Sequence, residues 1–172
     1  MMITVEQPTT TWNDEVHLLV DTAAQELMFK QNGKISKSYS ISTAQNGVGE
    51  KKGSFQTPRG WHYIRAKIGQ GLPINTIFTA RRACGEFTPQ LEETYPDKDW
   101  ILSRILWLSG LEFGKNRLGD CDTMQRFIYI HGCPDSKPMG VALSHGCIRM
   151  RNQDIIALFD AIPIGMKVFI QG

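Results

Sequence analysis

Two short segments near the C-terminus gather the residue types that nucleophilic catalysis requires. Cys147 lies within Ser144–Met150, a segment that reads SHGCIRM, and His131 lies within Ile130–Gly132, which reads IHG. A thiol attacks a carbonyl as its thiolate, so it needs a base or a positive field nearby, and the negatively charged adduct needs fixed hydrogen-bond donors. Together the two segments supply all of these groups and predict a cysteine acyl-transfer enzyme.

The residues around the thiol suggest individual roles. Cys147 is the expected nucleophile, because Gly146 before it allows an exposed turn and a close approach to substrate. His131 is the better candidate for the base, since it ends a predicted strand and a long loop can fold back from it toward Cys147. His145 stays open as a second candidate, because residues two apart in an extended chain share a face.

Stabilisation of the adduct can come from the same loop. The backbone N–H groups of Gly146 and Cys147 are expected to form the oxyanion hole. Arg149 offers a planar fork that could hold a substrate carboxylate. Ser144 is expected to orient the loop through hydrogen bonds.

A different class of protein would use these residues as metal ligands. The segments His131–Cys133 and His145–Cys147 repeat a His-x-Cys pattern, and two His with two Cys could close a tetrahedral zinc site. A zinc-stabilised binding module is therefore the alternative to an enzyme. Neither pair has the Cys-x2-Cys spacing of zinc ribbons, so we expect no metal and no other cofactor.

The N-terminal third of the chain, followed by Trp61–Ile68, is typical of β-structure. Asn32 and Gly33 form a tight-turn signal between runs of strand-forming residues, which predicts a β-meander. Residues 81–126 are less regular, and their most apolar piece, Trp100–Leu108, fits a strand and a helix equally well. The predicted strands are Val16–Val20, Glu26–Phe29, Lys34–Ser42 and Trp61–Ile68.

The C-terminal third contains the clearest helix. A buried strand over Arg126–Ile130 is expected to deliver His131 at its end. Asn152 is the expected N-cap of the helix, and Pro163 ends it. Its apolar positions recur with helical spacing at Ile155, Leu158, Phe159 and Ile162, and Lys167–Ile170 closes the chain as a strand. The fold class predicted is mainly β with one C-terminal helix.

Composition limits the remaining possibilities. The chain has 172 residues, 41% of them hydrophobic and 21% charged, which suits one domain over residues 1–172. The net charge of +2 is spread without a basic run, so neither a nucleic acid nor a membrane is an expected partner. Residues 1–14 lack a basic region followed by an apolar stretch, which favours a cytoplasmic location, or a periplasmic one if a native export signal is missing. The four cysteines are expected to be reduced: Cys84, Cys121, Cys133 and Cys147.

These motifs resemble the catalytic signature of the YkuD-type L,D-transpeptidase family. Two further segments are similar to the family pattern: Thr57–Trp61 resembles its Thr-Pro-x-Gly-aromatic turn, and Gly165–Ile170 resembles its closing strand. The resemblance spans most of the chain, from Val16 to Ile170.

The resemblance implies a fold of mixed β-sheets, like a sandwich or barrel. It also implies a cysteine enzyme that cuts peptidoglycan stem peptides between an L-configured centre, usually of meso-diaminopimelate, and a terminal D-alanine. Cys147 matches the family's nucleophile and His131 its base. The oxyanion and substrate-binding positions are matched by His145, Gly146 and Arg149, with Ser144 and Gly132 beside them. Cys133 departs from the family pattern and could make activity sensitive to redox conditions.

The acceptor of the acyl group decides the reaction. Water gives L,D-carboxypeptidation of a peptidoglycan tetrapeptide or muropeptide, whereas an amine of a second stem peptide gives a 3–3 crosslink. The expected cytoplasmic location favours a carboxypeptidase of peptidoglycan recycling, with a cell-wall transpeptidase as the alternative. Because the resemblance implies an acyl-enzyme, carbapenems are expected to add covalently to Cys147.

Overall fold

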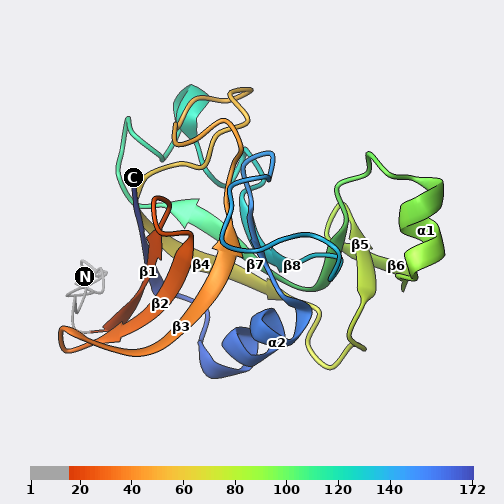
Figure 1. Cartoon of the computed structure of the whole chain (residues 1–172). Coiled ribbons are helices and arrows are strands. Elements are labelled where there is room, and N and C mark those ends of the chain that lie inside the picture. Colours follow the sequence, from red (N-terminus) through yellow and green to blue (C-terminus); the bar gives the residue numbers. More distant parts are fainter. Residues whose placement is uncertain (1–15) are drawn as a thin grey trace, which may run out of the picture.

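The computed structural model describes residues 16–172, and its strands form one ten-stranded sheet (Figure 1). The interpretation of residues 1–14 therefore lies outside the described residues. The strands are β1 (Val16–Asp21), β2 (Glu26–Gln31), β3 (Lys34–Ser42), β4 (Gly60–Ile68), β5 (Thr76–Thr79), β6 (Arg82–Glu86), β7 (Ile101–Gly110), β8 (Tyr129–Gly132), β9 (Ile148–Met150) and β10 (Lys167–Gln171). The helices are α1 (Pro89–Thr94), α2 (Asn152–Ala161) and a 3-10 turn at Gly119–Cys121.

Most of the sheet closes on itself. The strand order is β4-β10-β1-β2-β3-β9-β8-β7-β5-β6, and an additional pairing of β4 with β7 turns the first eight strands into a barrel. The pairs β1–β10 and β8–β9 are parallel and the others are antiparallel, so the sheet is mixed. The prediction of a mainly β, barrel-like fold with mixed strand directions is confirmed.

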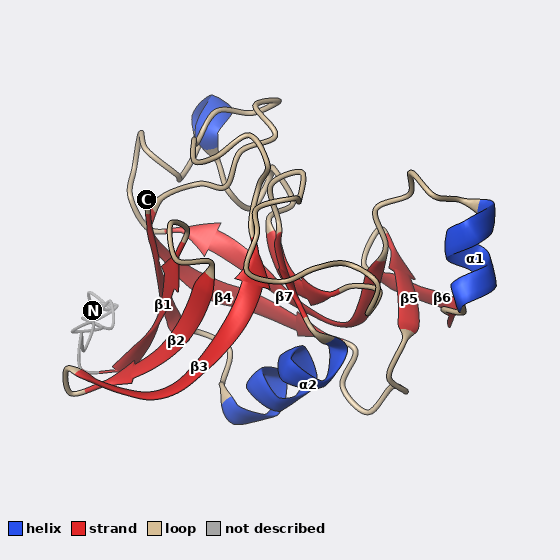
Figure 2. Cartoon of the chain, viewed as in Figure 1, coloured by secondary structure: helices blue, strands red, loops and turns tan. Residues whose placement is uncertain are grey.

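The C-terminal helix completes the main core. Ile155, Leu158 and Phe159 of α2 are buried and join one apolar cluster with side chains from the barrel strands. Figure 2 shows α2 lying beside the curved β1–β3 meander. Burying this apolar stripe is what stabilises the helix, because isolated helices of this length are marginal in water. Among residues 16–172 no helix is long and apolar enough to cross a bilayer.

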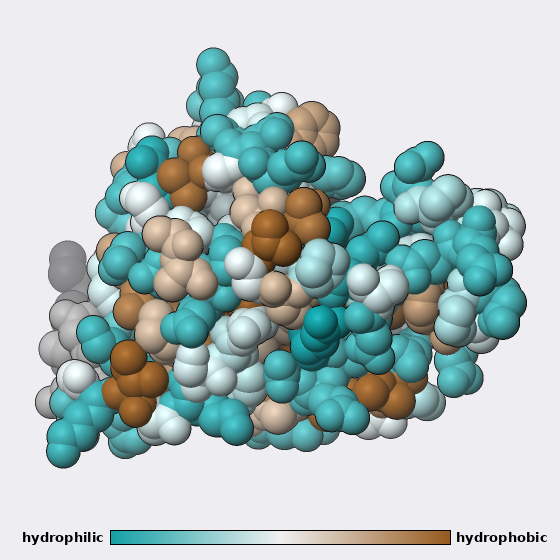
Figure 3. All heavy atoms as spheres, in the orientation of Figure 1, coloured by the Kyte–Doolittle hydropathy of each residue, from teal (hydrophilic) through white to brown (hydrophobic). Residues whose placement is uncertain are grey.

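A smaller lobe projects from the barrel at β7. The β5–β6 hairpin pairs with the start of β7, and α1 follows it (Figure 1). Its own apolar cluster contains Ile77, Trp100 and Leu102, with Phe87 and Leu91 packed against them. Figure 3 shows a recess in the molecular outline between this lobe and the barrel.

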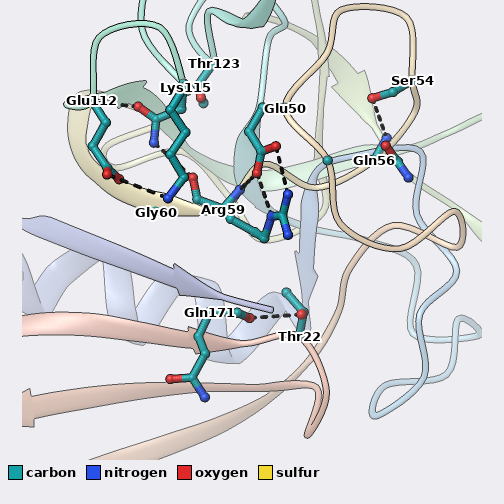
Figure 4. A network of polar contacts seen from close by, with 12 residues as sticks. Thr22, Glu50, Ser54, Gln56, Arg59, Gly60, Glu112, Lys115, Thr123 and Gln171 are labelled. Atoms are coloured by element: carbon teal, nitrogen blue, oxygen red, sulfur yellow. Dashed lines mark hydrogen bonds and ion pairs between the residues drawn. The ribbon is translucent and has the colours of Figure 1, made fainter.

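Polar contacts fix the loops that precede β4 and follow β7. Arg59 pairs with Glu50 at 2.7 Å, and the backbone N–H of Trp61 donates to Glu112 Oε2 at 2.7 Å. Figure 4 shows these two loops side by side above the barrel strands. The contacts hold the start of β4 and therefore also the Thr57 turn just before it.

Three sequence-based expectations need correction or completion. The ambiguous segment Trp100–Leu108 is a strand, β7, because its pairing with β4, β5 and β8 leaves its residues almost all buried. The strand predicted at Arg126–Ile130 begins only at Tyr129, since Phe127 lies in a turn with φ +55°. Asn152 is not the N-cap: Arg151 takes that position, and the buried Asn152 side chain instead donates to Cys133 O at 2.8 Å.

Candidate active site

Cys147 lies immediately before β9, at the wall of a cleft. Its sulfur accepts the backbone N–H of Tyr129 at 3.3 Å, and its thiol donates to Phe127 O at 3.4 Å. The side chain is half-buried. Desolvation by burial raises the pKa of the Cys147 thiol to about 12, although the Tyr129 N–H and the nearby Arg149 and Arg126 act in the opposite direction. The raised pKa favours a neutral thiol in the free protein, and such a thiol would need a base in order to act as a nucleophile.

His131 has the properties of such a base. It lies within β8 and is fully buried, and its Nδ1 lies 2.6 Å from Gly132 O. Because a carbonyl only accepts hydrogen bonds, Nδ1 carries the proton and Nε2 presents a lone pair. No hydrogen-bond partner contacts Nε2 among the described residues. Burial lowers the pKa of His131, which keeps the ring neutral and able to accept a proton.

Strand register places the base and the thiol on the same side of the sheet. β8 and β9 are parallel, with His131 opposite Arg149. Side chains two residues apart in a strand share a face, so Tyr129 and His131 project to the same side as Cys147 and Arg149. The predicted pairing of Cys147 with His131 is thus compatible with the sheet.

The loop before Cys147 is held by hydroxyl groups. Ser144 Oγ donates to Cys147 O at 2.5 Å and accepts the Gly146 N–H at 3.2 Å, which is the orienting role expected for it. Thr57 Oγ1 donates to Gly146 O at 2.9 Å from the opposite side. The Gly146 N–H would have to leave Ser144 to act in an oxyanion hole, which leaves the Cys147 N–H as the more available of the two donors. Gly146 has φ +134°, which few other residues adopt.

Gly132 accepts the hydrogen bond from His131 Nδ1 and also allows close packing of β8. A Cβ at this position would lie 2.4 Å from Asn152 Oδ1 and 2.6 Å from Leu102 O. The glycine therefore lets β8 approach both β7 and the first turn of α2.

Arg149, which is expected to hold a substrate carboxylate, contacts an acidic side chain of the protein itself. It is buried, and its Nη2 donates to Asp99 Oδ1 at 2.8 Å. Asp99 also lies 3.9 Å from Nδ1 of His145, whose side chain is 61% exposed. A substrate carboxylate would have to displace Asp99 from Arg149.

Cys147 opens into a cleft of about 470 Å³ between the barrel and the β5–β6 lobe. The polar lining includes Arg81, Asp99, Arg126, Tyr129 and His145. A second cleft of about 260 Å³ shares Arg126 and His145 with the first. The two clefts therefore adjoin at Arg126 and His145.

The sequence alone could have indicated some of the additional residues. Tyr129 precedes His131 by two positions, so strand alternation places it on the catalytic face. Asp99 lies just before β7, whose start pairs with the end of β8, but that pairing is not readable from the sequence. Arg81 and Arg126 lie in the segment where the sequence signal is weakest.

The zinc alternative finds no supporting geometry. Among residues 16–172 no three His, Cys, Asp or Glu side chains gather closely enough to hold a metal ion. Cys133, the possible redox partner, is buried and donates to Met150 O at 3.5 Å, and burial raises the pKa of its thiol to about 11. The four cysteines are free thiols, as expected.

Comparison with known proteins identifies the family. Residues 15–170 match the family model of the L,D-transpeptidase catalytic domain, YkuD. The chain belongs to the L,D-transpeptidase family. The matched range includes the SHGCIRM and IHG segments, whose strands β8 and β9 pair in parallel.

Curated L,D-transpeptidase relatives are longer than this chain. "Probable L,D-transpeptidase YbiS" of Escherichia coli is 28% identical over 160 residues, which make up 90% of this chain and 45% of that protein. "Probable L,D-transpeptidase ErfK/SrfK" of Salmonella typhimurium is 47% identical over 124 residues, 70% of this chain and 35% of that protein. The chain thus spans less than half the length of these relatives.

Solved L,D-transpeptidase structures share the fold. An L,D-transpeptidase from Mycobacterium smegmatis superposes with a TM-score of 0.54 at 19% identity, covering 92% of this chain and 59% of that one. LdtMt1 in complex with imipenem superposes with a TM-score of 0.55 at 17% identity, covering 91% and 59%. The barrel with its C-terminal helix is therefore the architecture of an L,D-transpeptidase catalytic domain.

Proposed function

We propose that this protein is a cysteine acyl-enzyme that releases the terminal D-alanine from peptidoglycan tetrapeptides, acting mainly as an L,D-carboxypeptidase. The observation that carries the proposal is the buried His131, whose unpartnered Nε2 can accept a proton on the strand face that also carries Cys147. Membership of the L,D-transpeptidase family supports the choice of substrate. The preference for water as acceptor is consistent with a half-buried thiol that opens into a solvent-accessible cleft.

The first half of the reaction forms a thioester. As the sulfur of Cys147 attacks the carbonyl of the third stem residue, the thiol proton moves to Nε2 of His131. The oxygen of the tetrahedral adduct becomes an anion, for which the Cys147 N–H is the candidate donor. The C–N bond then breaks, and His131 returns the proton to the amine of the departing D-alanine.

The second half restores the enzyme. His131 takes a proton from a water molecule while the oxygen of that water attacks the thioester carbonyl. The C–S bond then breaks and releases a tripeptide. The sulfur regains its proton. Because the pKa of the free thiol is raised to about 12, thiolate forms together with proton transfer to His131 and is not stored in the resting enzyme.

A specific observation favours transpeptidation as the second candidate. The cleft on the other side of His145 adjoins the one that contains Cys147, so a second stem peptide has room to approach. The curated relatives are also named as L,D-transpeptidases. An amine in place of water would then yield a crosslinked dimer.

Product analysis tests both candidates. Purified protein is incubated with a disaccharide tetrapeptide, and the products are separated by liquid chromatography and weighed by mass spectrometry. We expect tripeptide and free D-alanine with wild type and neither product with Cys147→Ala. Dimers as the main product would replace the carboxypeptidase proposal with transpeptidation, and D-alanine release that survives in Cys147→Ala would overturn the nucleophile.

Covalent inhibition gives an independent test of the acyl-enzyme. LdtMt1, a structural neighbour, was solved in complex with imipenem. We expect imipenem to increase the intact mass of this protein by one acyl group, and Cys147→Ala to abolish the increase while Cys84→Ala leaves it unchanged. An equal mass increase in Cys147→Ala would place the reactive group elsewhere.

A further inference from the structure

Arg81 occupies an unusual turn at the tip of the β5–β6 hairpin. Thr79 pairs with Arg82, so the turn consists of Ala80 and Arg81 alone, with φ values of +47° and +65°. Two-residue turns with positive φ at both positions normally use Asn-Gly, because other side chains are strained there. The backbone of the hairpin is therefore strained at Arg81, a residue that lines the cleft.

The guanidinium of Arg81 is held firmly. Its central carbon lies 4.8 Å from the ring centre of Trp107 and 4.9 Å from that of Phe127, so two aromatic rings flank it. Its Nη1 donates to the hydroxyl of Tyr129 at 2.9 Å. Aromatic stacking and a neutral hydroxyl orient the cation but do not neutralise its charge.

The charge of Arg81 is left available. Within residues 16–172 no Asp or Glu forms an ion pair with it, whereas Arg149 is paired with Asp99. Arg126, the other arginine in the cleft, donates to Gly49 O, Ser54 Oγ and Gln56 O and so anchors a loop. Arg81 is thus the cleft arginine with the most donors left for a ligand.

Tyr129 links this cation to the nucleophile. Its backbone N–H donates to Cys147 Sγ at 3.3 Å, and its hydroxyl accepts from Arg81 at 2.9 Å. Arg81 and Cys147 also line the same cleft. The sulfur and the guanidinium therefore contact opposite ends of the same tyrosine, its backbone N–H and its hydroxyl.

We propose that Arg81 is a specificity-determining residue that binds the carboxylate of the departing C-terminal residue. One residue spans about 3.5 Å, so a peptide carbonyl in contact with Cys147 brings the carboxylate of the next residue toward Arg81. A planar guanidinium suits a carboxylate because it can donate two parallel hydrogen bonds. This assignment rests on the proposed function and adds the residue that recognises the free carboxylate one residue beyond the cleaved bond.

The test compares two substrates that differ only in this carboxylate. One is the tetrapeptide ending in D-alanine, and the other ends in D-alanine amide. The variant is Arg81→Asn, because asparagine tolerates positive φ and removes the charge without adding strain to the turn. Arg82→Ala is the matched control, since Arg82 is exposed on the same hairpin and does not line the cleft.

We expect wild type and Arg82→Ala to cleave the acid about 10- to 100-fold faster than the amide, measured as kcat/KM, with most of the difference in KM. Arg81→Asn should lose this preference by slowing on the acid alone, and Arg81→Lys should recover part of it. Thermal unfolding shows whether each variant is folded.

Three results would count against the proposals and can be told apart. Equal rates on acid and amide in wild type, or an undiminished preference in folded Arg81→Asn, would overturn the role of Arg81 while leaving the proposed function intact. Loss of activity on both substrates in folded Arg81→Asn would make Arg81 a general structural support of the cleft and overturn its specificity role. A wild-type enzyme that releases no C-terminal group from either substrate would overturn the proposed function itself and the Arg81 assignment with it.

Discussion

At the scale of single residues, the chemistry depends on protonation states that burial sets. The carbonyl of Gly132 fixes the proton of His131 on Nδ1, and desolvation lowers the pKa of the ring while it raises that of the Cys147 thiol. Both shifts favour the neutral forms. In the proposed mechanism, a neutral thiol and a neutral imidazole form the resting state from which a proton transfer coupled to attack starts.

The two candidate bases can be separated by substitution. We expect His131→Gln to lower kcat for D-alanine release by at least about 100-fold, because a general base typically contributes a factor of this size or more. His145→Gln should keep kcat within a few fold, since the ring of His145 is exposed. Steady-state assays on the tetrapeptide provide the measurement, with imipenem acylation as a second readout. The reverse ranking would assign the base to His145.

At the scale of elements, separate segments converge on the loop that carries Cys147, the proposed nucleophile. Thr57 precedes β4, is fully buried, and bridges two segments by donating to Gly146 O and accepting the Ala44 N–H at 3.0 Å. The backbone N–H of Ser144 donates to the carbonyl of Thr43, the residue before Ala44, at 2.8 Å. The loop geometry therefore depends on a hydroxyl group and a backbone carbonyl contributed from distant parts of the chain.

Removal of the Thr57 hydroxyl should affect both stability and catalysis. Thr57→Val keeps the shape of the side chain but leaves the Ala44 N–H and Gly146 O without their partner, at a cost of about 1–3 kcal/mol in the free energy of unfolding. The Cys147 loop should loosen, so we also expect a lower kcat. Urea unfolding and tetrapeptide assays measure the two effects.

Thr94→Val is the matched control for this substitution. The Thr94 hydroxyl is exposed on α1 and bonds only to Gln90 O among the described residues, so its loss should change stability by less than about 0.5 kcal/mol. Equal effects of the two substitutions would show that Thr57 does not support the loop.

At the scale of the whole molecule, closure of the barrel buries a histidine that must remain neutral. His62 of β4 is fully buried, with Nδ1 2.9 Å from Gly60 O and Nε2 2.9 Å from Thr123 Oγ1. Desolvation lowers the pKa of His62 to about 4 from its ordinary value of 6.5. Since β4 pairs with both β10 and β7, His62 stays buried only while the sheet is closed.

Stability should therefore fall with acidification. Above pH 6.5 His62 is neutral in both the folded and unfolded states and adds no pH dependence. Between pH 6.5 and pH 4 the His62 ring is protonated in the unfolded state but stays neutral in the folded state. The free energy of unfolding therefore falls as the pH is lowered, by about 3 kcal/mol in total for this group. Burial lowers the pKa of His131 as well, so that residue acts in the same direction.

Urea unfolding at several pH values between 7 and 4 measures this effect. His62→Gln removes the titrating group, so its free energy of unfolding should depend less steeply on pH than that of wild type across this window. Parallel pH profiles for wild type and His62→Gln would contradict the assignment of the acid sensitivity to His62.

Residue types and their spacing were enough to predict the candidate reacting groups, the family resemblance and the local elements. Tight turns, alternating strands and the apolar stripe of α2 are encoded within a few residues, and the SHGCIRM and IHG segments indicate a chemistry through residue type and spacing. The structure confirmed the mainly β fold and the final helix, whose core positions Ile155, Leu158 and Phe159 are buried.

The contacts between groups far apart in the chain depend on the three-dimensional fold. Asp99, rather than a ligand, pairs with Arg149 because the start of β7 lies beside the end of β8, and the β5–β6 hairpin brings Arg81 to the cleft that contains Cys147. These contacts join residues far apart in the chain, and they arise from sheet closure and strand register. Local periodicity sets which face of a strand is buried, but it carries no information about which strand becomes its neighbour.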